Sequence, residues 1–309
     1  MKILIAGGTG LVGSALVENF KRFYPNVIGI SSKDFDLRNM TDTFEYIQNL
    51  QPDVVIDAAA RVGGIKYNKE YPGEFIMDNL QIQNSLIIAC HKSNVSKFVF
   101  LGSSCVYPRD CSQPILEEYL LSGPLEQTNK AYAVAKIAGL EAVRAYRNQY
   151  GHKWISIMPT NLYGPGDNFN ENKSHVIPAL IRKFVDAKER NMKTVSLWGD
   201  GSPRREFMHV HDFASAVKMI LDRYDQEIHI NVGTGKDISI RNLAKLISDA
   251  VGYHGEILWS GNDLNGTPQK LLDISRLKSI GWHQKIELES GLSQTVDWYL
   301  NNGERLRSE

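Results

Sequence analysis

Short apolar runs alternate with longer amphipathic stretches through the first half of the chain. Four runs have the length and composition of buried strands, and they span residues 2–6, 27–30, 53–58 and 97–101. Three longer stretches carry apolar residues at helical spacing, and they span residues 14–23, 75–91 and 129–150. Strand and helix therefore follow one another in turn, and this order predicts βαβ units.

Repeated βαβ units predict an α/β fold, with a Rossmann-type doubly wound parallel sheet. Ligands of such sheets bind beyond the carboxyl ends of the strands, so we expect the loops at residues 58–64 and 102–105 to belong to the site. The 309 residues also exceed the size, about 250 to 300, at which a single core stops growing. We predict a first domain at residues 1–165, to which residues 206–224 return, and a smaller C-terminal lobe at residues 166–309.

Composition narrows the classes of function. The chain has 35 basic and 35 acidic residues, so a nucleic-acid partner is not expected. Its apolar runs are too short for a membrane helix or a signal peptide, which predicts a soluble, cytoplasmic protein. The three cysteines, Cys90, Cys105 and Cys111, lack metal-ligand spacing and suit a reducing compartment. We predict no metal site.

A glycine-rich segment, GGTGLVG, connects the first strand to the first helix. Glycines at this spacing permit a tight turn, a close approach of the backbone to a pyrophosphate and close packing of helix on strand. The N-terminus of the helix then offers free N–H groups to phosphate. This order of strand, glycines and helix predicts a dinucleotide site formed by Gly7, Gly8, Thr9, Gly10, Leu11, Val12 and Gly13.

The end of the second strand indicates which dinucleotide binds. An NAD enzyme usually has an acidic residue there for the ribose 2′-hydroxyl, whereas this chain has Ser31, Ser32 and Lys33. Two hydroxyls and a lysine suit a 2′-phosphate better, which favours NADP(H). Asp34 and Asp36 lie close by, so a solvated turn remains the alternative.

Two further segments contain candidate catalytic side chains. Tyr132 and Lys136 are four residues apart on a predicted helix, so both point the same way, and a nearby ammonium lowers the pKa of a tyrosine. The loop after the fourth strand contains Ser103, which could bind a carbonyl, and Cys105, which could exchange a proton. Cys90 is expected to pack in the core, and Cys111 to lie in a loop.

Together these motifs resemble the extended short-chain dehydrogenase/reductase superfamily of nucleotide-sugar enzymes. Further motifs narrow the resemblance to the GDP-L-fucose synthase family, whose members are 3,5-epimerases and 4-reductases of GDP-4-keto-6-deoxy-D-mannose. These motifs are GSSCVYP (102–108), PTNLYGPGDNF (159–169), SHVIPALIRKF (174–184), LWGDGSPRREFMHV (197–210), NVGTG (231–235) and GTPQKLLD (266–273).

The resemblance implies a role for each candidate catalytic residue. Tyr132 would donate a proton to the C4 oxygen, Ser103 would hold that oxygen, and Lys136 would bind the nicotinamide ribose. Cys105 and His175 would move protons at C3 and C5. From its own surroundings, before an apolar helix at residues 176–184, His175 would instead be interpreted as a cap or a packed imidazole.

The resemblance also implies the binding residues. The cofactor set gains Leu101, Lys136, Pro159, Asn161, Leu162 and His175. The substrate set is Asn161, Lys183, Trp198, Arg205 and Asn265, although relatives often have Asp at the last position. The first lobe would then bind NADP(H) and the second the GDP-sugar, and the tyrosine-bearing helix would pack against its twin in a homodimer.

Several alternatives share part of this pattern. A 4,6-dehydratase would be expected to have an acidic pair after the loop serine, and a 4-epimerase would not need both a thiol and an imidazole. A GDP-colitose synthase, or a reductase without epimerase activity, could keep every GDP and cofactor motif. A non-enzymatic NADP(H) sensor often loses the tyrosine or the lysine, and this chain keeps both.

Overall fold

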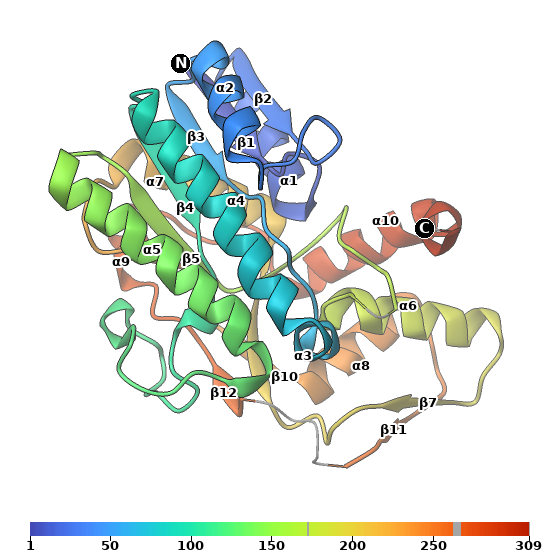
Figure 1. The fold of residues 1–309 in the computed structure, drawn as a ribbon. Helices are drawn as coiled ribbons and strands as arrows, with labels where there is room; N and C mark the ends of the chain where they lie inside the picture. Colours follow the sequence, from blue (N-terminus) through green and yellow to red (C-terminus); the bar gives the residue numbers. More distant parts are fainter. Residues whose placement is uncertain (172, 262–266, 309) are drawn as a thin grey trace.

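Six parallel strands form the central sheet, in the order β2-β1-β3-β4-β5-β9 (Figure 1). The computed structural model describes residues 1–171, 173–261 and 267–308. The strands of this sheet are β1 (Lys2–Ala6), β2 (Asn26–Ile30), β3 (Val54–Asp57), β4 (Lys97–Leu101), β5 (Ile155–Pro159) and β9 (Ile230–Val232).

Helices cover both faces of this sheet. Three of them, α2, α4 and α5, pack side by side on one face, while α1 and α7 pack together on the other (Figure 1). Their bounds are Leu11–Lys21 (α1), Met40–Leu50 (α2), Pro72–Lys92 (α4), Lys130–Tyr150 (α5) and Val210–Arg223 (α7). The predicted α/β class and doubly wound parallel sheet are thereby confirmed.

Most element bounds agree with the hydrophobic pattern, and two helices begin earlier than it predicts. The strands at residues 2–6 and 97–101 have the predicted ends. Helix α1 begins at Leu11 rather than at residue 14, so the last three residues of the GGTGLVG segment already belong to the helix. Helix α4 begins at Pro72 rather than at residue 75, since proline is favoured at the first helical position.

The chain order reverses at β1, next to the edge strand β2. Strand β1 lies between β2 and β3, so the chain runs outward from β1 in both directions. A crevice forms at such a reversal, outside the carboxyl ends of the strands. The loop after β1, which begins at Gly7, and the loop after β3, which begins at Ala58, both line a cavity there.

A second group of buried residues forms a smaller core, built on helices α6, α8 and α10. Strand β8 pairs with β10, β12 and β6, and a separate pair joins β7 to β11. The bounds are Asn161–Tyr163 (β6), Val176–Glu189 (α6), Thr194–Leu197 (β7), Arg204–His209 (β8), Asp237–Ser239 (β10), Ile240–Val251 (α8), Glu256–Trp259 (β11), Gln269–Lys270 (β12) and Leu288–Ser308 (α10).

The chain passes between the two cores more than once. Strand β8 belongs to the smaller sheet, yet helix α7, which follows it directly, packs in the core of the large sheet. The chain then adds β9 to the edge of the large sheet. Residues of the first core thus occur as far as residue 232 and again at Leu272, Ile274, Leu277 and Trp282. The predicted domain bounds stay a prediction.

Short helical segments complete the chain. They are α3 (Ile65–Glu70), α9 (Ser275–Ser279) and three turns of 3-10 helix at Ser104–Val106, Gln127–Asn129 and Glu117–Tyr119. Helix α3 and the turns at Ser104–Val106 and Gln127–Asn129 contribute residues to the site. Within the described residues, each helix is too short or too polar to cross a lipid bilayer.

Candidate active site

The GGTGLVG segment forms a tight turn at the carboxyl end of β1. Gly7 has a φ of +77°, a conformation that favours glycine. A Cβ at Gly13 would lie 2.0 Å from the carbonyl oxygen of Gly7, and a Cβ at Gly8 would lie 2.5 Å from the Cα of Gly29. Glycine is therefore needed for the turn and for packing, and the N-terminus of α1 faces the cavity at Gly10 and Leu11. This cradle fits a dinucleotide pyrophosphate.

The cavity at the carboxyl ends of β1 and β3 takes in most of the predicted cofactor residues. Those that line it are Gly7, Thr9, Gly10, Leu11, Val12, Ser31, Ser32, Leu101, Lys136, Pro159, Asn161, Leu162 and His175. Gly8 and Gly13 pack behind the wall instead.

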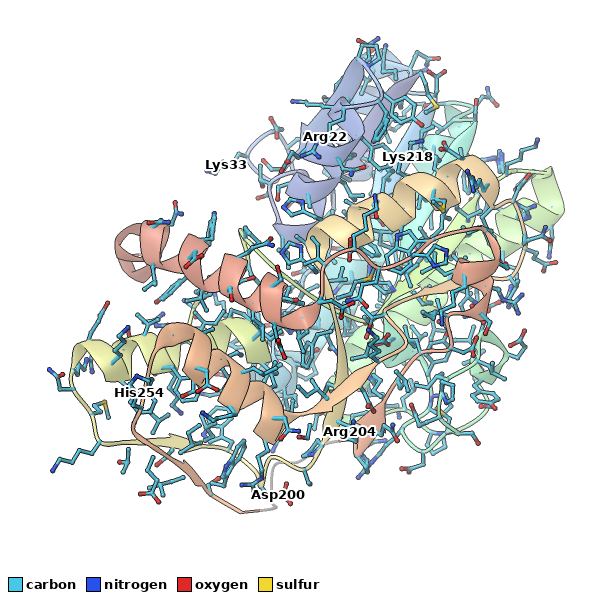
Figure 2. The ribbon with its side chains drawn as sticks, turned by 180° about the vertical axis from the view of Figure 1, so that it is seen from behind. Arg22, Lys33, Asp200, Arg204, Lys218 and His254 are labelled. Carbon is cyan, nitrogen blue, oxygen red and sulfur yellow. The ribbon has the colours of Figure 1, made fainter. Side chains whose placement is uncertain are left out.

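Lys33 is the third predicted cofactor residue that does not line this cavity. Figure 2 shows it at the outer edge of the loop after β2. Arg38 is the cation that lines the cavity near this loop, where carboxylates of Asp36 and Asp78 hold it at 2.7 and 3.0 Å. The sequence pattern did not single out Arg38, since it lies at the far end of this loop, two residues before α2 begins.

A second cavity, of about 640 Å³, lies between the two cores. It contains the predicted residues Cys105, Lys183, Trp198 and Arg205. Cavities of a few hundred Å³ with a small number of polar groups are typical of small-molecule sites. The predicted substrate residues of α6, of β8 and of the segment after β7 therefore come together with Cys105 of the turn after β4.

The two cavities meet at the residues with the candidate chemistry. Ser103, Tyr132, Asn161 and His175 line both of them. Lys136 lines only the first cavity and Cys105 only the second. A molecule in either cavity would therefore reach Tyr132, with the lysine on one side and the thiol on the other.

The surroundings of Tyr132 differ from the prediction. Burial, with smaller contributions from Cys105 and Asp57, raises the pKa of Tyr132 well above its ordinary value. Lys136 does not outweigh this burial: its ammonium lies 6.0 Å from the centre of the Tyr132 ring and donates to the Leu101 carbonyl at 2.9 Å. That Lys136 lowers the pKa of Tyr132 stays a prediction. A phenol in this state holds its proton at neutral pH and is suited to donate it.

The turn after β4 presents a hydroxyl and a thiol. The Oγ of Ser103 accepts the backbone N–H of Cys105 at 3.3 Å, so its own O–H can point into the cavities. Burial raises the pKa of the Cys105 thiol, while the charges of Lys270 and Lys136 and the Ser103 hydrogen bond lower it. Proton exchange at this thiol therefore depends on the cations around it.

Lys270 is a candidate functional residue that the sequence reasoning missed. It lines the second cavity, and burial is the main factor that lowers the pKa of its ammonium. The residue lies inside the GTPQKLLD motif, but its short strand gives no local sign of a site. Only the fold brings Lys270 to Cys105, across 165 residues of chain.

His175 stands at the N-terminus of helix α6 and faces both cavities. The residue is solvent-accessible, although its ring lies deep among protein atoms, and this burial lowers the pKa of the imidazole. Its side chain does not cap the helix, so the cap interpretation is not supported. A neutral imidazole at this point can accept a proton at physiological pH.

The nucleotide end of the second cavity is more open. The Nζ of Lys183 donates to the Ser196 carbonyl at 2.6 Å, and the Trp198 side chain is 66% exposed. Arg205 is half-buried, and burial lowers the pKa of its guanidinium. The Nδ2 of Asn161 donates to the Glu206 carbonyl at 2.8 Å. Asn265 lies outside the described residues.

Comparison with known proteins identifies the family. The model of the NAD dependent epimerase/dehydratase family matches residues 3–233. GDP-L-fucose synthase 1 of Arabidopsis thaliana is 48% identical, covering 97% of this chain and 94% of its own, and GDP-L-fucose synthase of Escherichia coli K12 is 43% identical, covering 99% and 98%. The chain belongs to the GDP-L-fucose synthase family. The resemblance found in the motifs is thereby confirmed.

Solved structures agree with this assignment. A GDP-6-OMe-4-keto-L-xylo-heptose reductase from Campylobacter jejuni has a TM-score of 0.91 at 35% identity, covering 97% of this chain and 98% of its own. A GDP-L-fucose synthetase from Naegleria fowleri bound to NADP has a TM-score of 0.88 at 30% identity, covering 98% and 93%. The prediction of NADP(H) as cofactor is confirmed by this family membership. A GDP-L-colitose synthase of Yersinia pseudotuberculosis is more distant, at 38% identity over 97% of this chain and 98% of its own.

Proposed function

We propose that the protein converts GDP-4-keto-6-deoxy-D-mannose to GDP-L-fucose, by epimerisation at C3 and C5 followed by reduction at C4. The observation that supports this best is the meeting of the two cavities at Ser103, Tyr132 and His175. A ketosugar in the second cavity would have its C4 carbonyl at Tyr132. The first cavity, which shares these residues, would hold the cofactor that supplies a hydride to the same carbon.

Cys105 and His175 perform the epimerisation. The C–H bonds at C3 and C5 flank a ketone and are acidified by it, because loss of either proton gives an enolate. Inversion needs a base on one face of the carbon and an acid on the other, and a thiol and an imidazole can both exchange protons near neutral pH. Hydrogen bonds from Tyr132 and Ser103 stabilise the enolate oxygen.

Tyr132 completes the reduction. Bound NADPH supplies a hydride to C4, and the negative charge develops on the C4 oxygen. The protonated phenol of Tyr132 donates its proton to that oxygen, while the hydroxyl of Ser103 holds the oxygen in place. Lys136, which lines the first cavity, would hold the nicotinamide ribose of the cofactor through its ammonium group.

The open end of the second cavity binds GDP. Lys183 and Arg205 provide positive charge for the diphosphate, and Trp198 offers a flat, exposed ring for the base or the ribose. We also propose that Asn161 contacts the sugar, since it lines both cavities. The first domain thus holds the cofactor and the second lobe holds the nucleotide sugar.

Two rival functions keep the same cofactor and GDP residues. A GDP-colitose synthase would act on a 3,6-dideoxy ketosugar, and a reductase would act without epimerisation. The presence of both Cys105 and His175 at the cavity walls favours an epimerase over a simple reductase. A colitose synthase inverts only C5, whereas the proposed enzyme inverts both C3 and C5. The number of epimerised carbons therefore distinguishes the two functions.

The test is to supply GDP-4-keto-6-deoxy-D-mannose and NADPH, follow the loss of reduced cofactor, and identify the sugar by NMR. GDP-L-fucose as the product supports the proposal. A reduced sugar with unchanged configuration at C3 and C5 would identify a reductase. If no cofactor is consumed, turnover of the 3,6-dideoxy ketosugar would identify a colitose synthase.

We further propose that the enzyme is a cytoplasmic homodimer. Cys90, Cys105 and Cys111 are free thiols, as expected in a reducing compartment. Helices α4 and α5 pack together on one face of the sheet, and their exposed side chains include Met77 and Val134. Apolar side chains on neighbouring helices suit a contact with a second copy of the chain.

A further inference from the structure

A buried carboxylate, that of Asp57, lies at the cofactor end of the site and has no role in the steps above. Asp57 is the last residue of β3 and is 0% exposed. Its Oδ1 accepts the backbone N–H of Ala59 at 3.2 Å, while its Oδ2 is buried without a hydrogen-bond partner among the described residues. An anion in this position is costly unless a positive charge lies nearby.

Lys136 supplies that positive charge. In the parallel register of β3 and β4, Asp57 pairs with Phe100, and the ammonium of Lys136 lies 4.8 Å from the centre of the Phe100 ring. Lys136 is only 3% exposed, and it lines the same cavity as Asp57. The anion and the cation are therefore buried together in the wall of the cofactor cavity.

The proposed role of Lys136 requires an ammonium and not an amine. An ammonium has three N–H groups, and Lys136 donates one to the Leu101 carbonyl at 2.9 Å. The others can then serve the hydroxyls of the cofactor ribose. Burial lowers the pKa of Lys136, whereas the charge of Asp57 raises it. The protonation of Lys136 on α5 thus depends on the carboxylate of Asp57 at the end of β3.

The remaining titratable groups around this pair cannot replace Asp57. Cys90 faces it from α4, Tyr132 from α5 and Cys105 from the turn after β4. Burial raises the pKa of each of the three groups, so all are uncharged near neutral pH. Within the described part of the cluster, Asp57 is the group that can be anionic.

We propose that Asp57 is a positioning residue for reduction: it is the buried counter-charge that keeps Lys136 protonated and its N–H groups directed at the cofactor ribose. This inference rests on the proposed role of Lys136. The decisive experiment nevertheless needs neither cofactor nor substrate, so it can fail independently of the proposed reaction.

The first test measures the protonation of Lys136 directly. The full chain is labelled with 13C at the lysine Cε, and the Lys136 signal is assigned by its loss in Lys136→Met. In Asp57→Asn the amide oxygen can still accept from Ala59, but the negative charge is gone. We expect the titration midpoint of Lys136 to fall by at least about one pH unit, a tenfold change in acidity. An unchanged midpoint would overturn the proposal.

The wild-type protein offers a second measurement, which does not depend on the folding of a variant. Burial raises the pKa of Asp57 to about 6. Protonation of Asp57 should therefore move the Lys136 signal near pH 6. The matched control is Asp53→Asn, since Asp53 lies just before β3, at the opposite end of the strand, with its side chain 57% exposed. We expect the Lys136 titration of this variant to match the wild type.

Cofactor affinity separates a positioning role from a merely structural one. NADPH binding, followed by the fluorescence of the reduced cofactor, should weaken more in Asp57→Asn at pH 9, by up to the roughly tenfold that one pH unit allows, than at pH 6.5, where we expect less than about twofold. An equal loss at both pH values would overturn the proposal. A wild-type enzyme that makes no GDP-L-fucose would defeat the proposed function, while the lysine titration would still decide the role of Asp57.

Discussion

Tyr132 carries the most specific prediction at the scale of the single residue. In Tyr132→Phe only the hydroxyl is lost, and the ring can keep its edge-on contact with Phe75 at 6.2 Å. We expect reduction to slow by about 10² to 10⁴, the usual contribution of a positioned proton donor, with NADPH affinity unchanged. Stopped-flow loss of NADPH and a separate binding titration measure the two quantities. An undiminished rate would contradict the assignment.

Cys105 allows the two half-reactions to be separated. In Cys105→Ser, a buried hydroxyl replaces the thiol and is too weak an acid and base near pH 7. We expect exchange of the C3 and C5 protons with deuterated water to slow by at least about 100-fold, while NADPH is still consumed. The products would then include sugars reduced without inversion.

Cys111→Ser is the matched control for this experiment. Cys111 is also a free thiol, six residues further along the chain, but it does not line either cavity. Its substitution should leave deuterium exchange at the wild-type rate. Unchanged GDP-L-fucose output from Cys105→Ser would remove that thiol from the mechanism.

At the scale of the element, one carboxylate joins three segments that are far apart in the sequence. Glu206 of β8 is 0% exposed, and its Oε1 accepts the N–H groups of Thr234 and Gly235, both at 2.6 Å. Its Oε2 accepts the N–H of Leu272 at 3.0 Å. The NVGTG motif thus forms a turn around this side chain, where a Cβ at Gly233 would lie 2.3 Å from Oε1.

Glu206→Gln tests this junction. The amide keeps one acceptor oxygen but points an N–H₂ group at a backbone donor, so at least one charge-assisted hydrogen bond is lost. We expect the free energy of unfolding in urea to fall by about 2 to 3 kcal/mol. Glu256→Gln, at an exposed position on β11, should change it by less than about 0.5 kcal/mol. Equal stability of the two variants would show that the junction contributes little.

The difference between local patterns and contacts across the fold explains which features could be predicted from the sequence alone. Strand β4 was predicted with its observed ends because an apolar run is a local signal. The function of Glu206 could not be predicted, since its partners lie 28, 29 and 66 residues further along the chain. Asp57 appeared only as part of a buried strand, and its relation to Lys136 depends on the strand register. Motifs therefore supplied the candidate catalytic residues, while the fold supplied the groups that control them.

At the scale of the whole molecule, the two cores place the cofactor and substrate cavities next to each other, so that they share part of their walls. The large sheet ends at one cavity and the smaller core borders the other. Helix α5 carries Tyr132 at this junction, and the rest of the helix runs along the face of the sheet beside α4 (Figure 1). Any contact made by this face is therefore connected to Tyr132, the proposed proton donor, through a single helix.

That connection leads to the last prediction, on the proposed homodimer. Met77 on α4 and Val134 on α5 are 54% and 37% exposed, and the exposed Ala138 lies one helical turn after Val134 on α5. If two copies pack through this face, a charge there would be buried without a partner, which is strongly unfavourable. We expect light scattering at micromolar concentration to give twice the chain mass of 34.8 kDa for the wild type and the single mass for Val134→Glu.

Leu300→Glu, at an exposed position on α10, should stay dimeric, because that helix covers the other core. A monomeric wild type would remove the dimer, and a dimeric Val134→Glu would assign the contact to another face.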